Sequence, residues 1–288
     1  MKNNIIGFLF AMLWASASVA TKLGLLSAQP LIIANTRFFI AGFLMLFGAH
    51  LFRKYRLPKR DEWLPLLIYG LLNVTIYLGL YIVSMQELSA GVGSLSVALN
   101  PLMISILSAF WIKRAVKRNE WTGLILGIIG VSIVVYPLLL TSYVTIKGLI
   151  LMLLSLLAYS VGTVYYSSRT WRLPTLAING WQVLLGGICL LPFTFTLSDF
   201  TVNHYDARFW YAVLWLVFVS IVAVQMWLYL LKVDTVKASL WLYLCPTFGF
   251  IYAKILMNEP ITLFTIIGTL LVILGLYIGQ KKELRIKN

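Results

Sequence analysis

The stretch Ala98-Leu99-Asn100-Pro101-Leu102 places a proline inside an otherwise continuous apolar segment. Raising these numbers by 145 gives Tyr243-Leu244-Cys245-Pro246-Thr247, a second proline inside a second apolar segment. Glycines recur at the same offset: Gly42 and Gly187, Gly123 and Gly268, Gly130 and Gly275. The sequence therefore predicts two copies of one unit, which we place at residues 1–143 and 146–288.

The composition excludes an ordinary soluble domain. Of the 288 residues, 61% are hydrophobic and 11% are charged, whereas soluble domains average about 45–50% apolar and about 25% charged residues. Mean hydropathy is +0.91. Apolar runs of about 20 residues, the length that crosses a bilayer as a helix, follow one another along the chain. The sequence predicts an all-α membrane protein.

Ten apolar segments predict ten transmembrane helices, five in each copy. Because five is odd, the second copy must enter the membrane from the face opposite to the first. We therefore expect two inverted five-helix repeats around a central cavity, with a substrate site near the midplane. The predicted helices cover 5–26, 31–52, 63–84, 90–112, 121–140, 147–167, 176–197, 209–231, 238–257 and 261–280.

Basic residues predict the orientation. They gather in alternate connections, including 53–60 and 113–118, and in the tail after 280, whereas the other connections hold only Lys147 and Arg208. Lys and Arg are retained on the cytoplasmic side, so we expect a multi-pass protein of the inner (plasma) membrane with both termini cytoplasmic and an uncleaved first helix. The net charge of +14 is explained by these clusters and does not indicate a nucleic-acid partner.

This pattern resembles the EamA-type members of the drug/metabolite transporter superfamily. The resemblance rests on the ten helices in two copies, Trp14 in the first helix, Arg37 in the second, the stretch 80–101 and the glycine-rich fifth and tenth helices. It implies a basket-like bundle that moves small metabolites or drugs, often outward. Arg114 stands where the family often has Glu, whereas the second copy keeps Glu259.

Charged side chains inside membrane spans are candidate functional residues, because burying them in lipid is costly. Lys22 and Lys254 lie near span ends, where they can reach the interface. Arg37 lies about 10 Å below the surface by helix rise, and Glu87 is its expected partner. No carboxylate lies at mid-membrane. Arg37, Glu87 and Glu259 are therefore the candidate gating or coupling residues, and facilitated transport stays open.

Neutral polar and aromatic side chains in the middle of the spans are the candidate substrate-binding residues. Aromatic rings bind apolar or cationic groups, although each ring is also suited to helix packing. Pro101 and Pro246 are expected to break their helices and free a backbone carbonyl. Asn73, Tyr77 and Tyr81, spaced by four, share one helix face. The full candidate set is Trp14, Asn73, Tyr77, Tyr81, Asn100, Tyr159, Gln182, Gln225 and Trp241.

The sequence contains no signature of an enzyme. It has no Gly-x-Ser-x-Gly motif, no phosphate-binding loop and no metal-ligand spacing, so no cofactor or metal is expected. We expect a secondary transporter that exports amino acids or related amphipathic metabolites by alternating access. A broad drug exporter, a metabolite importer and a non-transporting membrane sensor or assembly protein remain alternatives. The expected partners are the substrate, the lipid bilayer and a proton or counter-substrate, and a homodimer stays open.

Overall fold

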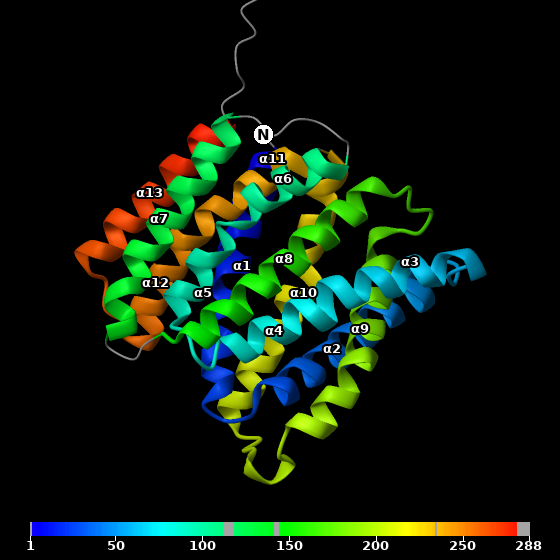
Figure 1. The fold of residues 1–288 in the computed structure, drawn as a ribbon. Helices are drawn as coiled ribbons and strands as arrows, with labels where there is room; N and C mark the ends of the chain where they lie inside the picture. Colours follow the sequence, from blue (N-terminus) through cyan, green and yellow to red (C-terminus); the bar gives the residue numbers. More distant parts are fainter. Residues whose placement is uncertain (1, 112–117, 141–143, 234, 281–288) are drawn as a thin grey trace, which may run out of the picture.

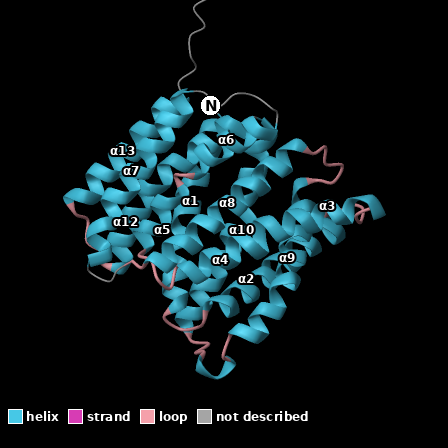
Figure 2. Ribbon diagram, in the orientation of Figure 1, coloured by secondary structure: helices cyan, strands magenta, loops and turns pink. Residues whose placement is uncertain are grey.

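The computed structural model describes residues 2–111, 118–140, 144–233 and 235–280. Within these ranges every regular element is a helix (Figure 2). Eight helices are long and apolar enough to cross a membrane, and two shorter apolar helices, Trp241–Met257 and Leu263–Gly275, follow them. The predicted all-α membrane architecture is confirmed. The eight long helices are Asn3–Leu25, Pro30–Phe52, Arg60–Ser84, Ala90–Trp111, Trp121–Leu140, Ile146–Ser168, Thr175–Leu197 and Ala207–Val233.

Six elements are continuous α-helices (Figure 1). Their apolar residues continue around the whole helix surface, as expected where lipid replaces water. They are α1 (Lys2–Leu25), α7 (Arg118–Leu140), α8 (Ile146–Ser168), α9 (Thr175–Leu197), α10 (Ala207–Val233) and α13 (Leu263–Gln280).

The remaining spans are interrupted. Two contain π-helical turns, η1 and η2, and one contains a 3-10 segment, η4; a further 3-10 turn, η3 (Phe200–Val202), lies in a connection. The interrupted spans are α2 (Pro30–Phe47) with η1 (Gly48–Phe52); α3 (Arg60–Gly70), η2 (Leu71–Ile76) and α4 (Tyr77–Ser84); α5 (Ala90–Val97) with α6 (Asn100–Trp111); and α11 (Thr235–Ser239), η4 (Leu240–Leu244) and α12 (Cys245–Met257).

Both predicted proline breaks coincide with an interruption. α5 ends at Val97, and Pro101 is the second residue of α6. Pro246 is likewise the second residue of α12, directly after the 3-10 segment η4. A proline at the start of a helix needs no N–H donor, so each proline begins a new helical segment within its span.

Spans at equivalent places in the two copies pack against each other: α2 on α9, α7 on α13, and α5 of the fourth span on α12 of the ninth. Gly42 lies against Leu184 and Gly180 against Leu46, so α2 and α9 run antiparallel. α7 and α13, which lie side by side at one edge of the bundle in Figure 1, are also antiparallel, because Gly130 meets Gly268 while the more N-terminal Gly123 meets Gly275.

The other large helix contacts also come in equivalent pairs. α1 packs on α10, and α8, the counterpart of α1, packs on α4, part of the counterpart of α10. α1 also packs on α12, and α8 packs on α6. The contact set therefore stays nearly the same when the two copies are interchanged.

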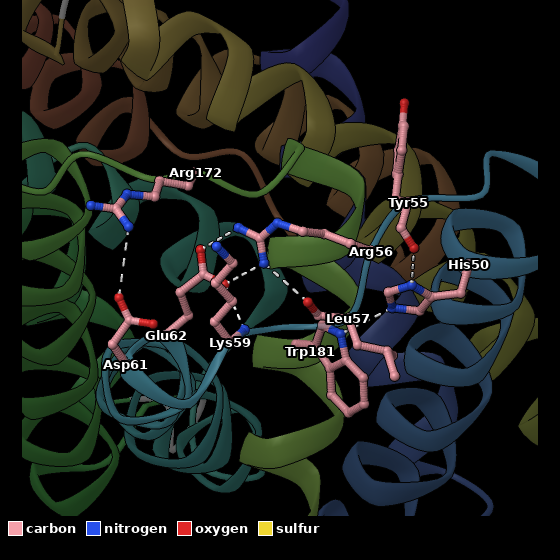
Figure 3. A network of polar contacts seen from close by, with 9 residues as sticks. All are labelled: His50, Tyr55, Arg56, Leu57, Lys59, Asp61, Glu62, Arg172 and Trp181. Carbon is pink, nitrogen blue, oxygen red and sulfur yellow. Dashed lines mark hydrogen bonds and ion pairs between the residues drawn. The ribbon is translucent and has the colours of Figure 1, made fainter.

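The connection between α2 and α3 is ordered by a polar network (Figure 3). Arg56 donates two hydrogen bonds to the Glu62 carboxylate, with N···O distances of 2.6 and 2.7 Å, and the Lys59 backbone N–H donates to the same group at 2.7 Å. The Trp181 indole on α9 donates to Nε2 of His50 at 3.1 Å. The bonds to Glu62 attach the basic connection 53–60 to the start of α3, and the bond from Trp181 attaches the end of the second span to the seventh span.

Candidate functional site

Six aromatic side chains meet in the middle of the bundle, and we call them the aromatic cluster. Tyr77 lies 4.7 Å from Tyr159 and 6.0 Å from Tyr81, measured between ring centroids. Tyr159 also lies 6.0 Å from Trp14, and all but Trp14 are buried. Helices of both copies therefore supply this cluster. Its members are Phe10, Trp14, Tyr77, Tyr81, Tyr159 and Trp227.

Asn100 borders the aromatic cluster at the start of α6. Its Oδ1 accepts a hydrogen bond from the Ser160 hydroxyl at 3.2 Å, one residue beyond Tyr159. Its Nδ2 group is buried without a hydrogen-bond partner among the described residues, and so is Nε1 of Trp227. Buried polar groups are nearly always paired. The centre therefore contains two N–H donor groups that a bound molecule can satisfy.

A chain of buried polar side chains lies beside the aromatic cluster, and we call it the amide network. Asn73 Nδ2 donates to Gln182 Oε1, and Gln182 Nε2 donates to Asn179 Oδ1, both at 3.0 Å. Asn179 Nδ2 then donates to the backbone oxygen of Ser220 at 3.0 Å. Arg37 ends the chain, with its Nε donating to the Ser220 hydroxyl at 3.1 Å. The network links η2, α9, α10 and α2.

The π-helical turn η2 separates two sets of contacts within one span. Asn73, inside the turn, faces Gln182, whereas Tyr77 and Tyr81, after it, face the aromatic cluster. A π-helical turn contains one more residue than an α-helical turn, and such turns are frequent at functional sites. The sequence prediction of one shared face for these three residues missed this local change of helix geometry.

The expected pairing of Arg37 with Glu87 is wrong. Glu87 accepts hydrogen bonds from Lys147 Nζ at 2.7 Å and from the Thr145 hydroxyl at 2.5 Å. Glu87 lies in the connection after α4, where Lys147 contacts it from the start of α8. Arg37 lies deeper along α2 and binds Ser220 instead. No salt bridge involves Arg37 in the described part of the chain.

Glu87 and Glu259 line one polar pocket of about 490 Å³, which we call the rim pocket. Both Glu259 carboxylate oxygens accept backbone N–H bonds at the start of α5, from Ala90 at 2.6 Å and Gly91 at 2.9 Å. A carboxylate at a helix N-terminus is favoured by the helix dipole. The complete lining is Lys22, Gln86, Glu87, Ser89, Thr145, Met257 and Glu259.

Lys22, near the end of its span, contributes its ammonium group to the rim pocket. Its Nζ donates to the backbone oxygen of Met85 at 3.0 Å and is within electrostatic range of Glu259. Lys254, by contrast, is exposed. The rim pocket therefore contains charges of both signs, each with a protein partner.

Gln225 and Trp241 lie outside the aromatic cluster and the amide network. Gln225 Nε2 donates to the backbone oxygen of Thr175 at 3.2 Å, at the start of α9. Trp241, in η4, packs on α1 so closely that the ring fills the space of a side chain at Gly7. Arg114 lies outside the described residues.

Sequence reasoning missed four central residues. Phe10 and Trp227 sit in unbroken apolar runs and were indistinguishable from packing residues. Ser220 carries only a hydroxyl. Asn179 had a usable signal, because it precedes Gln182 by three residues and therefore shares its helix face.

The described residues contain no group of three His, Cys, Asp or Glu side chains able to hold a metal ion. The centre contains aromatic faces, amides, hydroxyls and one guanidinium, which are groups of the kind that line binding sites for organic molecules.

The chain matches the EamA-like transporter family over residues 1–136 and 146–278. It is 26% identical to an uncharacterized transporter of Bacillus subtilis, covering 97% of this chain and 91% of the relative. It is 29% identical to an uncharacterized transporter of Archaeoglobus fulgidus, covering 98% of this chain and 100% of the relative. A relative from Salmonella typhimurium, named a probable amino-acid metabolite efflux pump, is 26% identical over 96% of this chain and 94% of its own length.

A solved crystal structure has the same fold, with a TM-score of 0.73, 18% identity and coverage of 97% of this chain and 96% of the other. The family matches account for both halves of the sequence and agree with the apolar helices. They also assign transport rather than enzymatic catalysis. The chain is a multi-pass membrane protein that belongs to the EamA-like transporter family.

Proposed function

We propose that this protein is a secondary transporter that exports amino acids or related amphipathic metabolites by alternating access between two inverted five-helix halves. The halves are residues 1–143 and 146–288, and each contributes five membrane crossings. The observation that carries the proposal is the central meeting of aromatic and amide side chains from both halves, with N–H donors that have no protein partner.

The inverted arrangement is supported by the directions of equivalent helices. α2 and α9, and also α7 and α13, occupy the same place in the two sequence copies and run antiparallel. Two repeats whose equivalent helices run in opposite directions cross the membrane in opposite directions. Secondary transporters built this way bind substrate where the repeats meet.

Alternating access assigns the rim pocket the role of a gate. Glu259 belongs to the second half and holds the start of α5 in the first, while Glu87 binds Lys147 of the second half and Thr145 of the connection between the halves. Opening at this end breaks these bonds. Glu87 and Glu259 are also the carboxylates available for coupling to a proton, and exchange against a counter-substrate is the alternative.

The proposed orientation places the basic connections and both termini in the cytoplasm, which puts the rim pocket on the outer face. This follows from the Lys and Arg bias and is supported by the rim pocket lying at the C-terminal end of α1, away from the connection 53–60. Reporter fusions test this orientation. Fusions at the C-terminus and at residues 53–60 should report the cytoplasmic face, and a fusion at residues 198–205 should report the outer face.

The function is tested by flux into inside-out vesicles with a panel of radiolabelled amino acids. Trp14→Ala and Asn100→Ala are expected to lower the initial rate at least about tenfold, because each removes a contact in the centre. Thr247→Ala, at an exposed position of α12, is the matched control and should transport at the wild-type rate. Unchanged flux in both central variants would show that the substrate does not bind there.

A further inference from the structure

The guanidinium of Arg37 is the least satisfied charge in the described structure. The side chain is 6% exposed, and its one hydrogen bond runs from Nε to the Ser220 hydroxyl. A guanidinium has five N–H donors and stays charged in proteins, and among the described residues its two terminal nitrogens make no hydrogen bond. Leaving a buried charge without an opposite charge is strongly unfavourable. No described residue forms a salt bridge with Arg37.

The neighbours of Arg37 do not supply that charge. Its cation lies 5.2 Å from the Phe38 ring centroid and within electrostatic range of the hydroxyls of Tyr77 and Tyr81. These groups are neutral in the interior. The acidic residues of the sequence all fall in connections or at helix ends. The centre of the protein therefore carries a net positive charge.

The orphaned groups of the aromatic cluster point to the same ligand chemistry. Asn100 Nδ2 and Trp227 Nε1 are both hydrogen-bond donors, so each requires an acceptor atom. Tyr77 connects the two regions, because it is near Arg37 on one side and in ring contact with Tyr159 on the other. Acceptor oxygen is the partner that each of these donors requires, and Arg37 requires negative charge in addition.

We propose that the centre recognises the carboxylate of an organic substrate, with Arg37 as its counter-charge. This inference rests on the proposed transport function. The planar fork of a guanidinium binds a carboxylate through two parallel hydrogen bonds. The aromatic cluster contacts the remainder of the substrate, and in an amino acid its rings face the ammonium group. Amines and polyamines without a carboxylate are excluded, because they meet a like charge.

The second copy provides the variant for the test. Gln182 occupies the repeat position of Arg37 and is fully buried with both ends of its amide hydrogen-bonded. Arg37→Gln therefore introduces the neutral residue that the fold accommodates at the equivalent place. Arg37→Lys keeps the charge but removes the fork. Lys254→Gln, which removes an exposed cation from another span, is the matched control.

The experiment measures ligand binding to the purified full-length chain by calorimetry and by thermal shift, in chloride-free buffer. The probes are phenylalanine, 3-phenylpropanoate, phenylalaninamide and 2-phenylethylamine, together with the corresponding leucine series. We expect the carboxylates to bind and the amides and amines to fail. Arg37→Gln should weaken carboxylate binding about ten- to a hundredfold, Arg37→Lys less, and Lys254→Gln not at all.

Three results would overturn this inference: amides or amines binding as well as the carboxylates, no binding by any carboxylate, or unchanged carboxylate affinity in Arg37→Gln. Chloride alone producing the same Arg37-dependent shift would also overturn it, because the partner would then be an inorganic anion. Flux in proteoliposomes separates the two proposals. Carboxylate binding that depends on Arg37 without any flux refutes transport only, whereas flux of amines alone refutes the carboxylate site only.

Discussion

The rim pocket and the centre of the bundle treat charge in opposite ways. At the rim, Glu259 receives two backbone N–H bonds, Glu87 is held by Lys147 and Thr145, and Lys22 donates to a carbonyl. In the centre, Arg37 has a single neutral partner. The rim charges are paired within the protein, whereas the proposed ligand would supply the opposite charge to Arg37. Substitution of Arg37 should therefore act mainly on transport, whereas substitution of a residue whose hydrogen bonds are made within the protein should lower stability.

Arg37→Gln is expected to give the largest effect and to separate the two properties. Transport should fall at least about tenfold, while the melting temperature stays equal to that of the wild type or rises, because an uncompensated buried charge is removed. Melting curves and initial rates on the same preparation test this. A melting temperature lowered by several degrees would instead make Arg37 a structural anchor.

Gln182→Leu should have the largest effect on stability. It leaves Asn73 Nδ2 and Asn179 Oδ1 buried without their present partner, and unsatisfied groups of this kind cost about 1–3 kcal/mol each. Denaturant unfolding in detergent measures the loss. The double variant Asn73→Leu/Gln182→Leu should cost less than the sum of the single variants, and strict additivity would contradict a coupled network.

Glu259→Gln should produce an intermediate loss of stability, accompanied by a change in transport rate smaller than that of Arg37→Gln, because the gate bonds to α5 are weakened. The amide can accept through one oxygen only and loses the charge at the N-terminus of α5, which together are worth about 1–2 kcal/mol. Gln86→Ala, at an exposed position in the same pocket, is the control and should be neutral. A loss of transport without a loss of stability would move Glu259 from the gate to substrate or proton binding.

The smallest effect is a pH dependence at Glu87. The hydrogen bond from Lys147, followed by that from Thr145, holds the pKa of Glu87 below its usual 4.5. A lowered pKa in the folded state stabilises the protein at pH values above 4.5, and this contribution disappears as the pH falls through the folded-state value. The melting difference between wild type and Glu87→Gln should be small near pH 7 and vanish in acid. A difference that grows toward pH 3 would contradict this assignment.

The sequence was most informative about architecture. Apolar runs located the eight long helices and the two shorter ones, and the repeated prolines located the interruptions before Asn100 and Cys245. These features depend on local composition and on the missing N–H of proline. They can therefore be identified without knowing which helices touch.

The site was less accessible, because its partners lie far apart in the chain. Ser220 is 183 residues from Arg37, and Ala90 is 169 residues from Glu259. Neither Ser220 nor the backbone of Ala90 has a sequence signal that names its partner. Tyr77 and Tyr159 were both selected as aromatic candidates, but their contact depends on packing of α4 against α8. Pairing across helices requires the folded structure.

The glycine contacts between α7 and α13 are symmetric with respect to the two copies. Gly130 lies against Gly268, the copy of Gly123, while Gly275, the copy of Gly130, lies against Gly123 itself. A surface is self-complementary when its contacts stay the same after the two helices that form it are interchanged. A half-length protein ending in α7 would thus already fit a second molecule of itself turned end over end. In that ancestor-like dimer, one substitution at this surface would be felt at two contacts at once.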